Sequence, residues 1–117
     1  MSNITTGRLG EQIAKDYLLE KGYQILEQNY HSHWGEIDLI VKKGDKISFI
    51  EVKTKVGTAK GQPYESFTPR KKHNLMRPIQ YYLLQNNLKS YKLSLDVISI
   101  LLEEDKSIEK IIHFENV

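Results

Sequence analysis

Cysteine is absent from the 117 residues of this chain. Without cysteine there is no disulfide framework, no thiolate zinc site and no thiol nucleophile, and the composition fits a reducing cytoplasm. Long apolar runs are also missing, since none approaches the roughly 18 residues of a membrane span. The N-terminus, Met-Ser-Asn-Ile-Thr-Thr-Gly, lacks the apolar segment of a signal peptide. We therefore expect one cytoplasmic domain over residues 1–117, with no membrane partner.

The small net charge of +2 hides an uneven distribution along the chain. Residues 42–77 hold ten Lys and Arg against three acidic residues, a net charge of +7. The rest of the chain holds seven basic and twelve acidic residues, a net charge of −5. A basic middle third favours a polyanionic partner, and the alternative is a solvated basic face without any partner.

The spacing of apolar residues predicts the element order αβββαββ. Residues 7–21 carry an apolar stripe at helical spacing, with Thr6 as N-cap and Gly22 as the stop. Thr68-Pro69 is a strong start for a second helix that continues to about Asn86. A crossover helix after a three-stranded meander predicts an α/β fold with a mixed sheet flanked by helices. The expected strands are 23–30, 35–42, 46–54, 91–102 and 107–114, with a connection at 31–34 and a loop over 55–67.

Gly35 to Lys55 is predicted to be a β-hairpin around Gly44-Asp45, a pair suited to a two-residue type II′ turn. Paired residue numbers would then sum to 89, which sets Asp38 opposite Glu51 and Glu36 opposite Lys53. Strand alternation would put these four charged side chains on one face. Opposed Cβ atoms lie about 4.5–5.5 Å apart, so the two carboxylates repel unless a cation separates them. A divalent metal ion is the natural cation, and an exposed salt-bridge cluster is the alternative.

The apolar residues of the same hairpin predict how it packs. Alternation would place Ile37, Leu39 and Val41 on one face against the first helix. Ile40 and Phe49 would cover the other face near the turn. The change from apolar to charged residues within each strand is a local inconsistency of the kind that marks functional sites.

Four other side chains are candidates for the site or for contacts near it. Glu11 lies at the margin of the apolar stripe, where it could reach the hairpin, although a first-turn Glu is also favoured by the helix dipole. His31 and His33 lack a third zinc-type ligand, so a loop or nucleic-acid contact is favoured over a metal site. Asp96 is interpreted as the structural partner of a basic group, with a supporting role at the site as the alternative.

The start of the second helix predicts an anion site. Arg70, Lys71 and Lys72 occupy its first turn, where the helix dipole disfavours cations. Free amides and basic side chains at a helix N-terminus suit a phosphate. Carboxylates without cysteine select Mg²⁺ or Mn²⁺ over zinc, and Lys53 could orient a metal-bound water. Together these parts suit phosphodiester hydrolysis, whereas no Ser/His/Asp arrangement supports acyl transfer.

The motif formed by Asp38 and Glu51-Val52-Lys53, after a helix that carries Glu11, resembles that of the PD-(D/E)xK nucleases. More closely, the chain is similar to the small bacterial YraN-like proteins, which are akin to archaeal Holliday-junction resolvases. The further matching residues are Gly7 to Gly10, Leu18, Gly22-Tyr23, Asn29-Tyr30, Gly35 to Ile37, Leu39-Ile40, Phe49-Ile50, Thr54, Lys71 and Leu95 to Val97.

The resemblance implies a restriction-endonuclease-like αβββαβ core, to which the last strand adds an extra C-terminal edge. It implies that Glu11, Asp38 and Glu51 bind Mg²⁺ or Mn²⁺ and that Lys53 is catalytic, with Glu36 in support. The implied activity is hydrolysis of DNA, branched or single-stranded, by a homodimer. The alternatives are a nucleic-acid-binding protein without turnover, acting in recombination, repair or DNA uptake, and a scaffold with a surface salt-bridge cluster. The expected nucleic-acid contacts are Arg70, Lys71, Lys72, Lys55 and Arg8.

Overall fold

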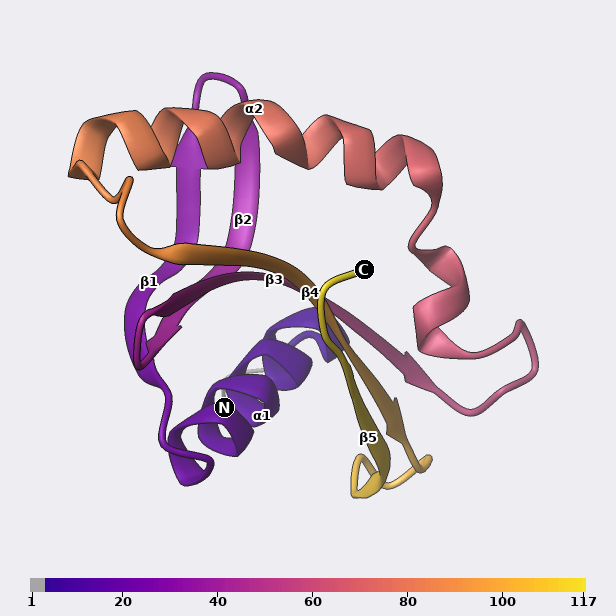
Figure 1. The fold of residues 1–117 in the computed structure, drawn as a ribbon. Helices are drawn as coiled ribbons and strands as arrows, with labels where there is room; N and C mark the ends of the chain where they lie inside the picture. The colour runs from indigo at the N-terminus through magenta and orange to yellow at the C-terminus, as the bar shows by residue number, and fades with distance from the viewer. Residues whose placement is uncertain (1–3) are drawn as a thin grey trace.

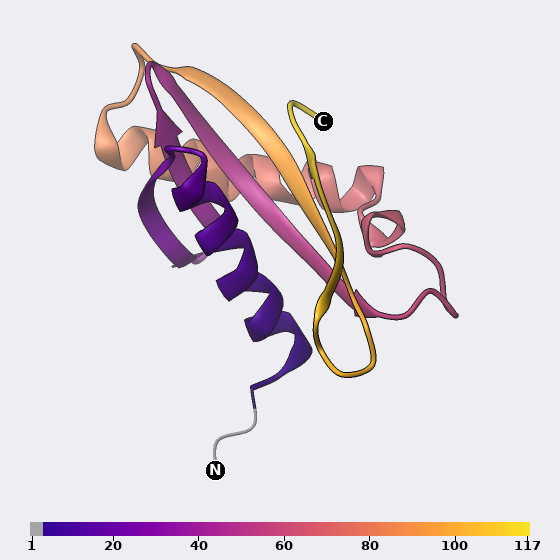
Figure 2. The ribbon, with the colours of Figure 1, turned by 90° about the horizontal axis from the view of Figure 1, so that it is seen from below.

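The computed structural model describes residues 4–117 and places one helix on each face of a five-stranded sheet (Figures 1 and 2). The strand order is β1-β2-β3-β4-β5, with β3 and β4 parallel and the other neighbours antiparallel. The mixed α/β fold and the extra C-terminal edge strand are thus confirmed. The elements are α1 (Thr6–Glu20), β1 (Gln24–Ser32), β2 (Gly35–Lys43), β3 (Lys46–Val56), a 3₁₀ turn (Pro63–Ser66), α2 (Pro69–Asn86), β4 (Lys92–Leu102) and β5 (Ile108–Phe114).

Helix α1 begins one residue earlier than its sequence predicts. The hydroxyl of Thr5, rather than that of Thr6, accepts the backbone N–H of Arg8 at 3.2 Å and caps the helix. The helix buries Gly10, Ala14 and Leu18, a four-residue spacing that keeps one stripe against the sheet. Within residues 4–117, neither helix is long and apolar enough to cross a membrane.

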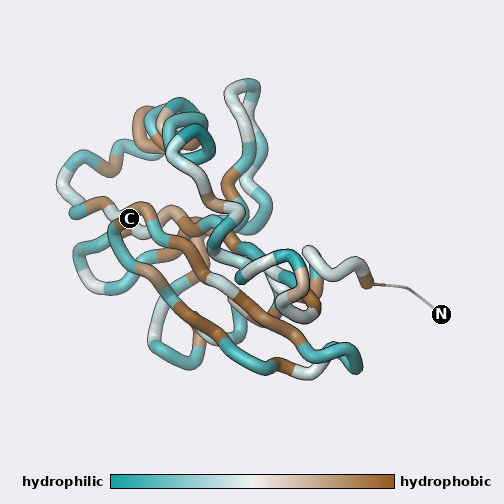
Figure 3. The backbone as a smooth tube through the Cα atoms, turned by 90° about the vertical axis from the view of Figure 1, so that its right-hand side faces the viewer, coloured by the Kyte–Doolittle hydropathy of each residue, from teal (hydrophilic) through white to brown (hydrophobic). Residues whose placement is uncertain are grey.

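Two apolar clusters form the core, one on each face of the sheet. Leu39, Val41 and Ile50 pack with α1, whereas Ile40 and Phe49 pack with α2. Apolar residues run along the central strands and polar residues gather at the turns (Figure 3). The other buried members of the α2-side cluster are Ile37 and Ile47 of the sheet and Leu75, Ile79 and Tyr82 of α2 itself.

The register of the β2–β3 hairpin is confirmed near its turn and wrong beyond it. Lys43 pairs with Lys46, and Leu39 pairs with Ile50, so the residue numbers do sum to 89. The β2–β3 ladder ends at the Leu39–Ile50 pair. Beyond that pair, β2 separates from β3 and is hydrogen-bonded only to β1. This separation also explains why Ile37 packs with α2 and not with α1 as expected.

The end of the hairpin therefore does not contain the expected cross-strand pairs. Glu36 lies opposite His31 of β1, and Lys53 lies opposite Ser99 of β4. Asp38 is not a ladder partner of Glu51. The strand-pairing basis of the predicted site was thus wrong, although, as shown below, its carboxylates still meet.

Two predicted connections are shorter than expected. Strand β1 continues through His31 to Ser32, which leaves His33 and Trp34 as the turn into β2. Strand β3 continues to Val56, where it pairs with Leu102 in the parallel ladder. The 3₁₀ turn then occupies part of the segment predicted to be an open loop.

Candidate metal and nucleic-acid site

The point at which β2 leaves β3 is where the candidate site lies. Strand β3 loses a backbone partner there, and the side chain of Asp38 replaces it. Its Oδ2 accepts the backbone N–H of Val52 at 2.8 Å. This bond satisfies a buried donor and fixes the carboxylate between the two diverging strands.

Glu51 lies next to Asp38 and is half-buried. Burial, and then the adjoining Asp38 carboxylate, raise the pKa of Glu51 to about 8, while Lys53 lowers it. At neutral pH the pair therefore holds a proton in place of a second negative charge. A metal cation in that position would relieve the same repulsion.

Glu11 brings a third carboxylate from α1. The helix approaches β3 closely because residue 10 is glycine: a Cβ there would lie 1.8 Å from Oγ1 of Thr54. Burial and the charge of Asp38 raise the pKa of Glu11. The side-chain hydrogen bond from Asn29 has the opposite effect on this pKa. Glu11 is thus close enough to Asp38 for their charges to interact, as the sequence predicts.

Two lysines border the carboxylates, one from β3 and one from α2. The close approach and the positive charge of Lys53 lower the pKa of Lys71. The charge of Glu51 acts on Lys71 in the opposite direction. Lys71 is held at the start of α2, where its backbone N–H donates to the Thr68 hydroxyl at 3.2 Å. The two ammonium groups and Glu51 therefore form one charged centre.

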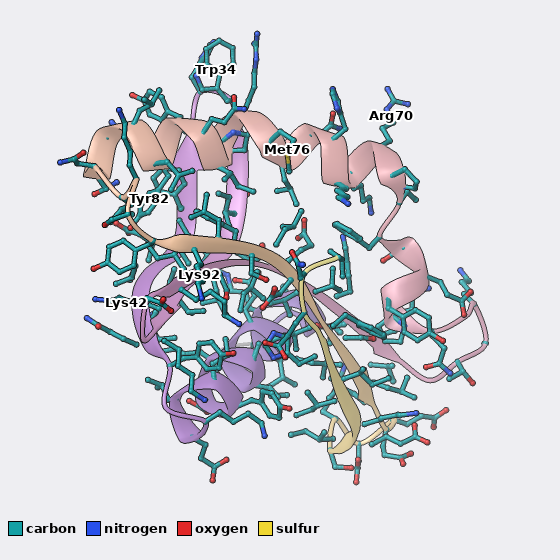
Figure 4. The ribbon with its side chains drawn as sticks, in the orientation of Figure 1. Trp34, Lys42, Arg70, Met76, Tyr82 and Lys92 are labelled. Atoms are coloured by element: carbon teal, nitrogen blue, oxygen red, sulfur yellow. The ribbon has the colours of Figure 1, made fainter. Side chains whose placement is uncertain are left out.

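The other predicted contact residues do not all join this centre. Arg70 points away from the sheet (Figure 4), and Lys72 is also exposed. The Nζ of Lys55 donates to the carbonyl of Lys60 at 2.9 Å. Arg8 lies near enough to Glu11 to lower its pKa. Lys71 is thus the basic residue of this helix start whose charge acts on the carboxylates, and the predicted anion site of Arg70, Lys71 and Lys72 stays a prediction.

Glu36 is exposed and lies away from Lys53, its expected partner. Its Oε1 lies 3.0 Å from Nδ1 of His31, which occupies the facing position on β1. Glu36 is still close enough to contribute to the raised pKa of Glu11, as the weakest of the causes. A supporting role at the site remains a prediction.

Both carboxylate oxygens of Asp96 accept hydrogen bonds, and these bonds link β4 to the C-terminal strand. Its Oδ2 lies 2.7 Å from Nε2 of His113, and its Oδ1 accepts from the Ser94 hydroxyl and the Asn116 backbone. Burial alone would raise the pKa of Asp96, but the hydrogen bonds from His113 and Ser94 hold it below its ordinary value. Glu115, a third potential metal ligand beside them, instead pairs with Lys46 at 3.1 Å. The interpretation of Asp96 as a structural partner agrees with this geometry.

The fold and this centre define a small mixed α/β protein whose meander opens around three carboxylates and two lysines. The chain belongs to the Uncharacterised protein family UPF0102, whose profile matches residues 10–100. A UPF0102 protein of Syntrophomonas wolfei is 46% identical over 114 residues, which cover 97% of each chain. One of Clostridioides difficile is 41% identical over 106 residues, covering 91% of this chain and 93% of the relative. The resemblance to the YraN-like family is confirmed, and the place in the nuclease superfamily stays a prediction.

Proposed function

We propose that this protein is a metal-dependent nuclease that hydrolyses phosphodiester bonds of DNA, with branched or otherwise structured DNA as its substrate. The observation that carries the proposal is that Asp38 and Glu51 lie side by side next to Lys53 and Lys71, with Glu11 near enough for its charge to interact with Asp38. These side chains come from α1, β2, β3 and α2, so only the complete fold assembles them. Like charges held close together and partly out of water destabilise the folded protein, and a bound ligand of opposite charge would remove that cost.

The donor set fits a hard divalent cation. Glu11, Asp38 and Glu51 offer only carboxylate oxygens, the ligands that Mg²⁺ and Mn²⁺ take. When bound there, the ion would supply an activated water and neutralise charge on the phosphate. The raised pKa of Glu51 supports this assignment, because a proton now occupies the position that a cation would take.

Other groups of the chain would orient the metal ligands, position the phosphate and stabilise its charge. The backbone N–H of Val52 keeps the Asp38 carboxylate oriented. Lys53 and Lys71 repel each other, and a phosphate between them would remove that repulsion while positioning the scissile bond. Lys53 is proposed to stabilise the negative charge that develops on the phosphate oxygens. Lys71 is proposed to bind the backbone beside it.

Labelled duplex, flap, four-way junction and single-stranded DNA, each with Mg²⁺ or Mn²⁺, would test this activity. The wild-type protein should cut at least one substrate only with metal, and Asp38→Asn and Glu51→Gln should lose at least about 100-fold in rate. Glu109→Gln, which neutralises an exposed carboxylate on β5, is the matched control and should cut normally.

Full-rate cutting by Asp38→Asn would reject the site. Salt-sensitive DNA binding that survives Glu51→Gln, without cleavage of any substrate, would favour the non-catalytic binding protein instead. The homodimer belongs to the same proposal, and sedimentation of the protein with and without a junction would test it.

A further inference from the structure

A second surface lies where the β1–β2 turn meets the outer side of α2 (Figure 4). Trp34 projects from this turn, and 44% of its surface is exposed. Tryptophan is highly buried on average, and here the exposed indole shares a surface hollow with Met76 and basic side chains, as binding sites often do. The patch around it contains no acidic residue; its other lining residues are His33, His73, Asn74, Met76, Arg77 and Gln80.

The turn holds the indole in one position. The Ser32 hydroxyl donates to the carbonyl of Gly35 at 3.0 Å and accepts the backbone N–H of Trp34 at 3.1 Å. Gly35 has a φ of +141°, a conformation that other residues rarely adopt. A Cβ on Gly35 would lie 3.5 Å from Pro78, so the turn rests directly on α2. The platform is therefore preorganised, which lowers the entropic cost of binding.

The immediate neighbours of Trp34 are a cation and an imidazole. The guanidinium carbon of Arg77 lies 4.3 Å from the centre of the indole ring. The His33 ring packs edge-on at 5.1 Å between ring centres. Aromatic and guanidinium planes of this kind are what unpaired nucleobases stack on. The positive charge and the absence of carboxylates in the patch complement the phosphates of the same strand.

The patch is connected to the candidate site by both of its elements. Arg70, His73 and Arg77 recur at helical spacing along α2, so basic side chains lead from the start of the helix to the indole. Trp34 immediately precedes β2 and is four residues from Asp38, a length of at most about 13 Å of chain. A base bound at Trp34 and a phosphate at the carboxylates could therefore belong to the same strand, a few nucleotides apart.

We propose that Trp34 and Arg77 form a stacking platform for an unpaired base of single-stranded or branched DNA. The choice of DNA rests on the proposed function, whereas the stacking itself needs only binding. A base held at Trp34 would place a phosphodiester bond a few nucleotides away at the carboxylates. The platform would thus select substrates in which single-stranded and duplex segments meet.

The protein contains a single tryptophan, so its fluorescence reports on Trp34 alone. We would titrate the full chain, in EDTA, with an oligothymidylate, a duplex of equal length and an abasic oligomer of equal length. The oligothymidylate should quench the fluorescence strongly, and the abasic oligomer should not. In anisotropy titrations, Trp34→Ala and Arg77→Lys should each weaken oligothymidylate binding by about tenfold and leave duplex binding within about twofold.

Leu84→Ala is the matched control, because Leu84 is 75% exposed on the same helix and lies outside the patch. It should bind like the wild type, and thermal melting should show that Trp34→Ala is folded. Equal quenching by the abasic oligomer, or unchanged oligothymidylate binding by Trp34→Ala, would overturn the platform. Fluorescence that changes with protein concentration but not with DNA would also overturn it, since a second copy of the chain would then cover the indole.

The quenching and cleavage experiments test the stacking platform and the nuclease activity independently. Metal-dependent cleavage without base-dependent quenching would reject the platform and keep the nuclease. Base-dependent quenching without cleavage of any substrate would keep the platform and reject the nuclease.

Discussion

Two carboxylates lie on neighbouring strands of the sheet, buried Asp96 and half-buried Glu51, and they differ in how their charges are balanced. Asp96 on β4 is opposite Ile50, and the next residue of β3 is Glu51. Asp96 receives hydrogen bonds from His113, Ser94 and the Asn116 backbone, and its pKa is lowered. Glu51 faces another carboxylate, and its pKa is raised to about 8. A buried acid with a complete set of donors is structural, whereas one that lacks them is prepared for a cation.

The largest expected contrast is between Asp96→Asn and Glu51→Gln. Asp96→Asn removes the charge that pairs with His113 and should lower the free energy of unfolding by about 3 kcal/mol. Glu51→Gln replaces a half-buried acid, largely protonated at neutral pH, by a neutral amide of the same shape and should leave the free energy of unfolding unchanged or increased. Urea unfolding of both variants would measure this, and equal losses would erase the distinction between the two acids.

The close approach of α1 positions the third carboxylate. Gly10→Ala should lower the free energy of unfolding by about 1–3 kcal/mol, because the new Cβ overlaps the Thr54 side chain. It should also weaken Mn²⁺ binding, because Glu11 moves with the helix. Gly7→Ala, where a Cβ meets nothing within 4 Å, is the matched control. Equal losses of melting temperature in Gly10→Ala and Gly7→Ala would contradict the close packing of α1 on β3.

A smaller contrast lies in the dependence of stability on pH. The Asp96 pKa is lowered on folding, so its contribution is present above the ordinary value of 3.8 and is lost as the pH falls through the folded pKa. The Glu51 pKa is raised, so stability should instead fall as the pH rises from 4.5 towards about 8. Urea unfolding across this range should show the second slope in the wild type. In Glu51→Gln the slope should be strongly reduced, leaving only the part due to the raised pKa of Glu11, and an unchanged slope would assign it elsewhere.

The sequence predicts most of the fold because its signals are local. Thr68-Pro69 starts α2 as expected, and Gly44 takes the positive φ that its turn requires. The departure of β2 from β3 was missed, because it depends on pairing with β1 and on packing under α2, which alternation within the hairpin does not report. The carboxylates still meet, but through the Asp38 bond to the Val52 backbone rather than through a cross-strand pair.

The patch at Trp34 was also missed, although a signal was present. The chain has one tryptophan, and it lies between two residues that shape a tight turn, Ser32 and Gly35. Arg77 is more than forty residues away in the sequence, so only the packing of the turn on α2 shows that the two meet. For Asp96 the sequence predicts a basic partner, but the structure is needed to identify it as His113, which comes from a different strand.

The raised pKa of Glu51 implies that a proton on this carboxyl, beside Asp38, occupies the place of a metal ion. Calorimetric titration with Mn²⁺ near neutral pH, in buffers of different ionisation enthalpy, measures both affinity and proton release. We expect binding with release of about one proton, lost in Glu51→Gln and in Asp38→Asn and kept in Glu109→Gln. Binding that is unchanged in Glu51→Gln, or that releases no proton, would contradict the account.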